Sequence, residues 1–333
     1  MKSHKLLGAL LALTLLAAAC GSAATPTPAP VAEPFRIAIV MPSAITDMAF
    51  SQSMYDALLE VQAEMGGASA LEIAYSEGMF NVPDAAAAIR DYANEGYDIV
   101  LAHGSQYGAS VQEVAPDFPE TTFAWGTNVD TFGLPNVFAY TAAAEEGGYV
   151  NGVMAAKLSQ SGIVGVTGPV EVGDAKTYID GFINGVKATN TDVQVNSTWT
   201  GSFSDVALMT EAANTHIAAG ADILTGSSQS VVGSIGAAQG KGDVLWFGTQ
   251  ADQASLAPEL VVASQLYDWT GIVKEMIAKH QAGTLGGEAF TLRLSNGGLK
   301  IIYGEGYELP ADAKAAAEAA IAGIKDSSIK PLP

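Results

Sequence analysis

Short apolar stretches alternate with longer helix-like stretches along most of this chain, and this alternation limits the fold more than any other feature. Residues 35–40 form an apolar run typical of a buried strand, and residues 50–65 have the pattern of a helix. The alternation continues with predicted strands at 71–75, 98–102 and 122–125 and predicted helices at 84–94 and 110–115. Strands that alternate with helices indicate βαβ units, and therefore a parallel sheet with helices on both faces.

The same series restarts near residue 162. Predicted strands at 162–166, 193–198, 222–224 and 244–247 alternate with predicted helices at 178–188, 205–219 and 231–239. The junctions also match, because Gly-Tyr-Asp-Ile-Val at 96–100 corresponds to Gly-Ala-Asp-Ile-Leu at 220–224. Any α/β chain repeats at roughly this pitch, but four elements in one order with shared junction residues favour two similar lobes.

Ligands of open parallel sheets bind beyond the carboxyl ends of the strands. Two lobes whose strand ends face each other would form a cleft, and closure about a hinge would trap a solute there. The rule selects six loops, at residues 41–50, 103–107, 126–130, 168–176, 226–230 and 248–253.

The first nineteen residues are predicted to be a secretory signal peptide. A basic start precedes an apolar run at 6–18, which is shorter than the roughly 20 residues that span a bilayer, and small residues follow it. Cys20, the only cysteine of the chain, comes next and resembles the cysteine of a bacterial lipobox. We therefore expect cleavage before Cys20 and lipidation of its thiol; the alternative is an ordinary signal peptide with an unrelated cysteine.

Residues 20–34 are rich in proline, threonine and alanine. Alternating prolines favour an extended polyproline II conformation, so this segment is predicted to be a semi-rigid tether. A lipid anchor followed by a tether implies a folded body held just outside a bacterial membrane, at the cell surface or in the periplasm.

Charge and cysteine content exclude several classes of function. The formal net charge of −20 argues against nucleic-acid binding, which needs basic patches, and favours a monomer whose surface resists association. One cysteine excludes a disulfide framework and multi-cysteine metal sites, and no histidine pair has metal-ligand spacing. We expect no metal, no cofactor and no enzymatic activity, since phosphate-loop and nucleophile-elbow motifs are absent. An enzyme with an unmarked Asp or Ser stays open.

Four segments resemble motifs of the basic membrane protein family. Residues 47–52 resemble its Asp-x-Ser-Phe-Asn-Gln signature, residues 181–186 its Gly-Phe-x-x-Gly-Val helix, residues 201–205 its Gly-Ser-Phe-x-Asp segment, and residues 248–253 its Gly-x-Asp-x-Asp-Gln loop. Members are lipoprotein solute receptors of ABC importers with the two-lobed α/β type I periplasmic-binding-protein fold. The resemblance implies three hinge crossings. They give an N-terminal lobe of 35–140 plus about 265–297 and a C-terminal lobe of 141–264 plus about 298–330.

The resemblance also implies a purine nucleoside or nucleobase held between aromatic rings. Phe50 is the expected stacking residue of the first lobe, with Phe203 or Trp199 opposite. Three positions depart from the family pattern by losing charge. They are Asn128 with its neighbour Thr127, Gln250, and Tyr267, which stands where a lysine is expected. Because a ribose is well bound by carboxylates and charge-assisted bonds, we expect a flat, uncharged heterocycle with little or no sugar, adenine-like before nucleoside.

Other residues complete the predicted ligand site, each with a structural role as its alternative. Trp125 and Trp269 would serve as walls, while Asn128 and Gln250 would offer both a donor and an acceptor to a purine edge. Asp252 has a helix cap as its alternative, and Gly226 a turn that favours positive φ. The remaining candidates are Asp47 and His103, while His216 is expected on a helix surface.

The sequence therefore predicts an extracytoplasmic solute-binding lipoprotein that captures its ligand without chemistry and presents it to ABC permease subunits. Three alternatives stay open. They are a binder of riboflavin or another aromatic heterocycle, a ligand sensor that signals to a partner without a permease, and an enzyme that turns over the bound purine.

Overall fold

The computed structural model describes residues 33–333, and the chain from Pro34 onward forms one compact unit. The predicted signal peptide (1–19), the predicted lipidation site at Cys20 and nearly all of the predicted tether (20–34) lie outside the described residues. Within the described part, no helix has both the length and the hydrophobicity to cross a bilayer.

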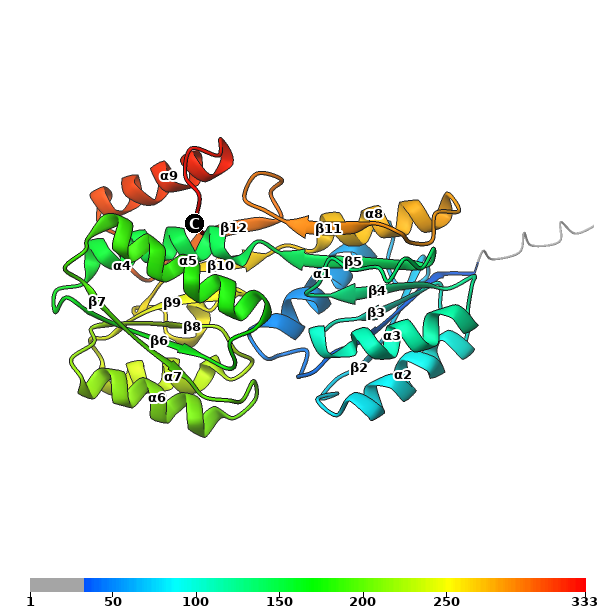
Figure 1. Cartoon of the computed structure of the whole chain (residues 1–333), viewed down its shortest axis with the longest axis horizontal. Helices are drawn as coiled ribbons and strands as arrows, with labels where there is room; N and C mark the ends of the chain where they lie inside the picture. The colour runs from blue at the N-terminus through cyan, green and yellow to red at the C-terminus, as the bar shows by residue number, and fades with distance from the viewer. Residues whose placement is uncertain (1–32) are drawn as a thin grey trace, which may run out of the picture. The chain divides into compact units, whose positions relative to one another are not determined.

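The described strands form two six-stranded sheets (Figure 1). The first contains β1 (Phe35–Val40), β2 (Leu71–Ser76), β3 (Ile99–Ala102), β4 (Thr122–Gly126), β5 (Val137–Ala142) and β11 (Ala289–Leu292). The second contains β6 (Ile163–Gly168), β7 (Gln194–Trp199), β8 (Ile223–Gly226), β9 (Leu245–Gln250), β10 (Val261–Tyr267) and β12 (Leu299–Tyr303). The strand orders are β11-β5-β4-β3-β1-β2 and β12-β10-β9-β8-β6-β7. Among these strands, only β12 runs antiparallel to its neighbour, β10.

Apolar residues on both faces of β1 explain why helices cover the first sheet on both sides. Ile37 and Ile39 pack in one core with α1 (Phe50–Met65) and α8 (Thr270–Gln281). Ala38 and Val40 belong to a second core with α2 (Val82–Asn94) and α3 (Gly108–Val114). Successive strand residues point to opposite faces, so a continuous apolar run needs two covers.

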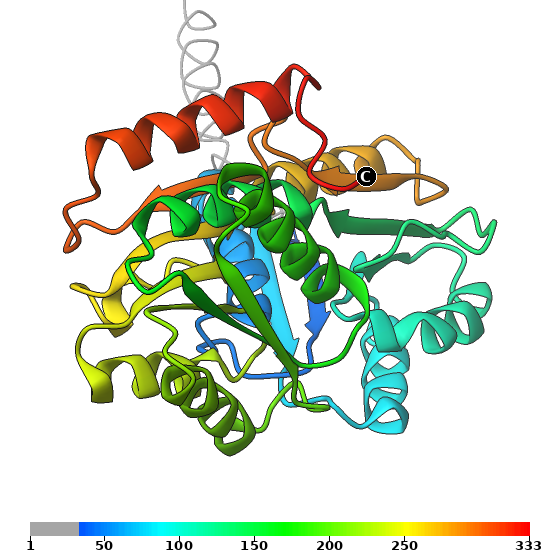
Figure 2. The same ribbon diagram turned by 60° about the vertical axis from the view of Figure 1, so that its left-hand side comes forward.

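The second sheet is covered in the same way. The helices α4 (Ala144–Leu158) and α5 (Gly173–Thr189) lie on one face, and α9 (Ala311–Lys325) packs on α4 (Figure 2). The helices α6 (Val206–Ala218) and α7 (Val231–Lys241) cover the other face. The predicted architecture of two α/β lobes is confirmed.

The chain passes between the two sheets three times, after β5, after β10 and after β11. We call the first sheet with its helices the first lobe and the second sheet with its helices the second lobe. A single apolar core runs through both lobes on the side that carries α1, α8, α4 and α5.

Glycines bring α4 and α5 into close contact. A Cβ added at Gly148 or Gly152 of α4 would lie 2.2 or 2.1 Å from the carbonyl oxygen of Tyr178 or Phe182 of α5. On α5, a Cβ at Gly185 would lie 2.1 Å from a backbone oxygen of α4. Since real side chains do not reach such distances, the Gly-Phe-x-x-Gly-Val segment is explained by backbone packing of two helices.

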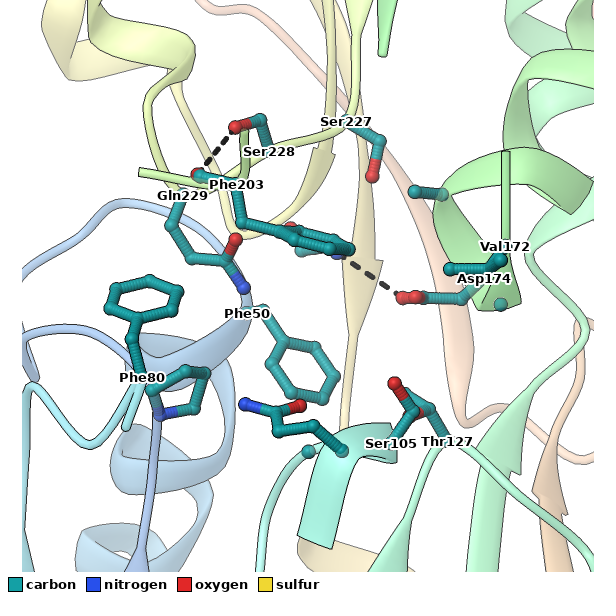
Figure 3. Close-up of a pocket in the computed structure, with 16 residues that line it drawn as sticks. Phe50, Phe80, Ser105, Thr127, Val172, Asp174, Phe203, Ser227, Ser228 and Gln229 are labelled. Carbon is teal, nitrogen blue, oxygen red and sulfur yellow. Dashed lines mark hydrogen bonds between the residues drawn. The ribbon is translucent and has the colours of Figure 1, made fainter. Parts of the chain in front are cut away.

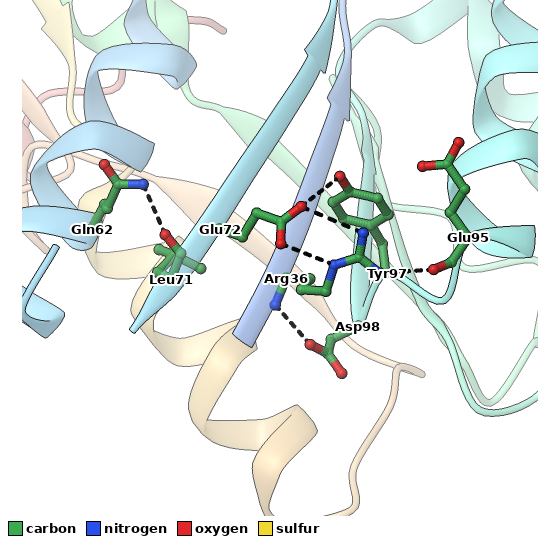
Figure 4. Close-up of polar contacts among 7 residues, drawn as sticks. All are labelled: Arg36, Gln62, Leu71, Glu72, Glu95, Tyr97 and Asp98. Carbon is green, nitrogen blue, oxygen red and sulfur yellow. Dashed lines mark hydrogen bonds and ion pairs between the residues drawn. The ribbon is translucent and has the colours of Figure 1, made fainter. Parts of the chain in front are cut away.

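The amino ends of β1, β2 and β3 are tied together on the edge of the first sheet opposite the predicted ligand loops (Figure 4). The Arg36 side chain donates to Glu72 at 3.2 Å and to the carbonyl oxygen of Glu95 at 2.7 Å, and it lies 4.0 Å from the Tyr97 ring centre. The Arg36 backbone amide donates to Asp98 at 2.7 Å. These contacts stabilise the end of the first sheet that lies opposite the predicted ligand loops.

The expectation of a surface position for His216 was wrong. Its side chain is buried, with 3% of the residue exposed, and Nε2 donates to the carbonyl oxygen of Val166 at 3.2 Å. Gly165 of β6 has no side chain, which lets the imidazole of α6 approach the sheet; a Cβ there would lie 2.5 Å from His216.

Candidate ligand-binding site

A cavity of about 340 Å³ lies between the carboxyl ends of the two sheets. This volume is in the range of about 300–1,000 Å³ that small-molecule sites usually have. All six loops selected from the sequence contribute to its lining, for example through Phe50 and Thr127 in the first lobe and Asp174, Ser227 and Gln250 in the second.

Two aromatic rings face the cavity from opposite lobes (Figure 3). Phe50 begins α1 and is 4% exposed, and its ring stacks on His103 with centroids 3.8 Å apart and planes at 6°. One face of Phe50 is therefore covered, and the other is available to the cavity. Phe203 follows β7 and projects from the second lobe, while Phe80 lines a third side. Flat aromatic ligands suit such a site, because rings stack favourably on rings.

The loop that carries Phe203 is hydrogen-bonded to the loop that follows β8. The carbonyl oxygen of Phe203 accepts hydrogen bonds from Ser228 Oγ at 2.7 Å and from Ser230 Oγ at 2.9 Å. The loops after β7 and β8 are thus joined, and the backbone from which the Phe203 ring projects is held in place.

His103 supports Phe50 as a neutral imidazole. Its Nε2 lies 2.9 Å from the carbonyl oxygen of Phe50, which can only accept, so Nε2 carries the proton. Nδ1 then accepts from the Tyr140 hydroxyl at 2.9 Å. Complete burial lowers the pKa of His103 to about 3, an effect that the bond to Phe50 opposes. His103 is therefore part of the wall and does not reach the cavity surface.

A fully buried aromatic cluster continues from His103 to the second lobe. Trp269 meets His103, Tyr140 and Tyr267 edge to face, with centroids 5.9, 5.2 and 5.7 Å apart. Its indole Nε1 donates to Ser53 Oγ of α1 at 3.0 Å. The predicted wall residue Trp269 and the predicted site residue Tyr267 therefore lie behind the cavity and connect its two sides.

Among residues 33–333, Asp174 is the only ionisable side chain that lines this cavity. Its Oδ2 accepts a hydrogen bond from Tyr267 Oη at 3.1 Å and one from Gln250 Nε2 at 3.2 Å. Burial raises the pKa of the Asp174 carboxyl, and the bonds from Gln250 and Tyr267 act in the opposite direction. The second-lobe wall of the cleft therefore carries one carboxyl group, that of Asp174.

Three buried polar atoms around the cavity have no hydrogen-bond partner within the described protein: Ser227 Oγ, Gln229 Oε1 and Gln250 Oε1. Buried polar groups are normally paired, so unpaired ones that converge on a cavity mark where a polar ligand would bind. Gln250 and Thr127 also hold left-handed φ angles of 74° and 58°, which is uncommon for residues other than glycine. Such strain is typical of functional sites.

Asp47 does not line the cavity but caps the helix that carries Phe50. Oδ1 accepts from the backbone amides of Ala49 and Gln52 at 2.8 and 3.1 Å, and Oδ2 accepts from the amide of Ser51 at 3.1 Å. Gln52 Oε1 in return accepts from the amide of Met48 at 2.9 Å. The segment 47–52 is thus a reciprocal cap that sets the start of α1.

Two predicted tryptophans lie away from the cavity surface. Trp125 is buried, stacks on Phe132 with centroids 4.8 Å apart, and donates from Nε1 to the carbonyl oxygen of Gly104 at 3.2 Å, so it supports a lining loop from behind. Trp199 ends β7 and lies over Gly168.

The remaining candidates have local roles. Asn128 Oδ1 accepts from the amides of Val129 and Asp130 at 2.8 and 3.0 Å, and the residue lines a second, adjoining cavity of about 640 Å³ that Asp174 also lines. Asp252 is exposed and accepts from the amide of Ala254. Gly226 is buried where β8 passes β6 and precedes the lining residue Ser227.

Sequence reasoning named the loops that hold Asp174, Ser227 and Gln229 but did not select these side chains. Phe80 was missed altogether. It follows β2, so the rule on carboxyl ends of strands would have found it had it been applied to that strand as well.

The family model for PnrA-like ABC transporter substrate-binding proteins, Bmp, matches residues 35–326. The chain belongs to this family. The family recognised from the four sequence motifs is thereby confirmed. Proteins of this kind bind solutes outside the cytoplasm and work with permease subunits, and they are not enzymes.

Individual relatives agree with the family assignment. This Bmp-family protein is 28% identical over 262 residues to a purine-binding protein of Brucella abortus, covering 79% of this chain and 73% of that one. It is 23% identical over 312 residues to an ABC transporter nucleoside-binding protein of Lactococcus lactis, covering 88% of each. A solute-binding protein of an ABC transporter system from Conexibacter woesei has the same fold, with a TM-score of 0.73, 24% identity and coverage of 90% and 98%. The expected type I periplasmic-binding fold is confirmed.

Proposed function

We propose that this Bmp-family protein captures a purine nucleobase, adenine-like, or a purine nucleoside, in the cleft between its lobes. The observation that carries the proposal is the position of Phe50 and Phe203, whose rings enter one cavity from opposite lobes (Figure 3). A base between two rings gains about 0.5–1.5 kcal/mol per aromatic pair beyond the burial of its area. The purine-binding and nucleoside-binding relatives support the same ligand class.

The polar residues of the cleft would then hold the edge of the base. Gln250 and Ser227 supply buried groups that have no partner among residues 33–333, so a ligand that pairs with them removes a cost that a wrong ligand leaves in place. The buried cluster behind the cavity would hold the two walls in fixed positions relative to each other; it contains His103, Tyr267 and Trp269. Asp47 and Trp125 would set the helix and loop that carry the lining residues.

Closure of the lobes would complete the site. We take 35–140 with about 265–297 as one moving body and 141–264 with about 298–330 as the other, joined by the three passages between the sheets. Gln253 Nε2 already donates to the carbonyl oxygen of Met48 across the two lobes at 3.0 Å. The closed, liganded form would be the one presented to the permease. Residues 1–19, Cys20 and the tether to residue 34 would keep the body at the membrane.

Calorimetry of the purified protein with adenine, guanine, adenosine, guanosine and riboflavin tests the ligand class. We expect adenine to bind more tightly than adenosine, and riboflavin not to bind. Phe203→Ala should weaken adenine binding by about tenfold, the value of one lost aromatic contact. The matched control is Leu208→Ala, which truncates an exposed side chain of α6 and should bind as wild type. Binding of nucleosides alone would refute the preference for a nucleobase over a nucleoside. Binding of riboflavin alone would refute the proposal that the ligand is a purine.

A further inference from the structure

We infer that Asp174 and Gln250 form a pair of hydrogen-bond acceptors that selects purines presenting an amino group to this wall over those presenting an oxo group. The inference rests on the proposed function, because it assigns a chemical preference within the purine class to one wall of the same cleft.

The orientation of the Gln250 amide is set by Asp174. Gln250 Nε2 lies 3.2 Å from Asp174 Oδ2. Rotating the amide by 180° would put its oxygen against the carboxylate, where neither group has a proton to donate. The amide nitrogen therefore faces Asp174, and Oε1 is left unpaired on a residue that is only 4% exposed.

Asp174 is likewise held in place, by side-chain donors and by the backbone amides of Ala175 and of Asp174 itself. Both side-chain donors that reach it, Tyr267 Oη and Gln250 Nε2, bond to Oδ2, and within residues 33–333 no side chain donates to Oδ1. In the described part of the chain, no basic residue lines this cavity and Asp174 takes part in no ion pair. Lys176 and Arg293, which line the adjoining cavity, pair with Asp180 and Glu146 instead. A partly buried carboxylate without a cation is costly unless donors approach it.

The wall thus offers a carboxylate oxygen and an amide oxygen to the same ligand. An exocyclic amino group carries two N–H donors and can satisfy both acceptors. An oxo group at that place would bring a third acceptor to the wall and leave all of them unpaired. Hydrogen bonds to charged groups and buried acceptors left unpaired each correspond to roughly 10- to 100-fold in affinity.

Adenine and hypoxanthine are the direct test, because they share one purine ring system and differ in the 6-amino or 6-oxo group, with an added proton on N1 in hypoxanthine. The readout is the ratio of their dissociation constants, measured by calorimetry on the purified protein. We expect wild type to favour adenine by at least about tenfold. Asp174→Asn, whose amide can donate to an oxo group, should bring the ratio to about one.

Asp192→Asn is the matched control. It removes one carboxylate from an exposed position of the same lobe, away from the cavity, and should keep the wild-type ratio. If Asp174→Asn fails to fold, Gln250→Met removes the other acceptor with little change in size and should lower the ratio several-fold.

The outcomes separate this inference from the proposed function. A ratio that Asp174→Asn or Gln250→Met leaves at the wild-type value overturns the acceptor pair while purine binding stands. A wild-type protein that binds hypoxanthine as well as adenine overturns it too. A wild-type protein that binds neither adenine nor hypoxanthine overturns the inference, and the proposed function falls as well if guanine, adenosine and guanosine do not bind either.

Discussion

At the scale of single residues, the cleft consists of side chains that line the cavity and side chains that hold them. Phe50, Phe203 and Gln250 belong to the first group. His103 belongs to the second, because its ring lies flat behind Phe50 and both of its nitrogens are bonded inside the protein. A ligand would therefore stack on the Phe50 ring, and the neutral imidazole of His103 supports that ring from behind.

His103 should make the stability of the protein depend on pH. Its pKa in the folded protein, about 3, is below the unfolded value of about 6.5, so the unfolded state binds the proton first. This residue costs no stability above pH 6.5, and its penalty grows as the pH falls towards 3. Between pH 7.5 and pH 5 the loss should be about 2 kcal/mol.

Urea unfolding of wild type and His103→Gln at both pH values measures this contribution. His216 and His280, whose pKa values are also lowered by burial, stay in both proteins and cancel in the comparison. The variant should be less stable at pH 7.5 but should lose about 2 kcal/mol less than wild type on going to pH 5. Equal losses in the two proteins would show that His103 is not held neutral.

The sequence identified some lining residues and not others for a physical reason. Phe50 and Phe203 lie in motifs whose spacing is local, and both line the cavity. Asp174 stands at the start of a helix, where an acidic residue is common in any protein, so no local pattern marks it. Its importance comes from Tyr267, which is 93 residues away in the sequence and reaches it only in the folded chain.

At the scale of elements, local patterns predicted most helices of the two repeats, missed α4 and α8, and did not predict the packing between helices. The helix expected at 50–65 coincides with α1, because Asp47 and Gln52 cap its start and Gly66 ends it in a left-handed conformation. The contact between α4 and α5 could not be foreseen, since glycines four residues apart in a helix, such as Gly148 and Gly152, do not identify the partner helix. Sheet order likewise depends on contacts between distant segments.

The contact between α4 and α5 predicts opposite effects for two glycine-to-alanine changes. In Gly152→Ala the new Cβ would lie 2.1 Å from the carbonyl oxygen of Phe182, so the helices must separate, and stability should fall by about 3 kcal/mol. In Gly236→Ala of α7 the Cβ has no heavy atom within 4 Å, and stability should rise by about 0.5–1 kcal/mol. Thermal unfolding compares the two, and a Gly152→Ala protein as stable as wild type would contradict the close packing.

At the scale of the whole molecule, the two lobes share a core on one side and enclose a cavity on the other. The shared core includes Trp269 and Tyr267, so bending at the three passages must proceed around these buried rings. The proposed capture of a ligand by closure would use this arrangement, whereas the choice of ligand would depend on only a few side chains. For that reason the repeated βαβ pattern was enough to predict the fold but not the solute.

The proposed anchor predicts where the protein is found in a bacterial cell. Full-length protein should sediment with membranes and be released by detergent but not by high salt, because a diacylated cysteine binds through its acyl chains. Cys20→Ser should move the protein to the soluble fraction, with the folded body still able to bind adenine. Membrane association that persists in Cys20→Ser would rule out the lipid anchor at this residue.

A crystal structure of the protein with adenine would show directly whether the cleft holds a flat purine between Phe50 and Phe203. We expect electron density for one ring system parallel to both phenylalanine rings, with the lobes closed over it. Adenine bound elsewhere on the protein, or in the cleft without contact to Phe203, would refute stacking between these two rings.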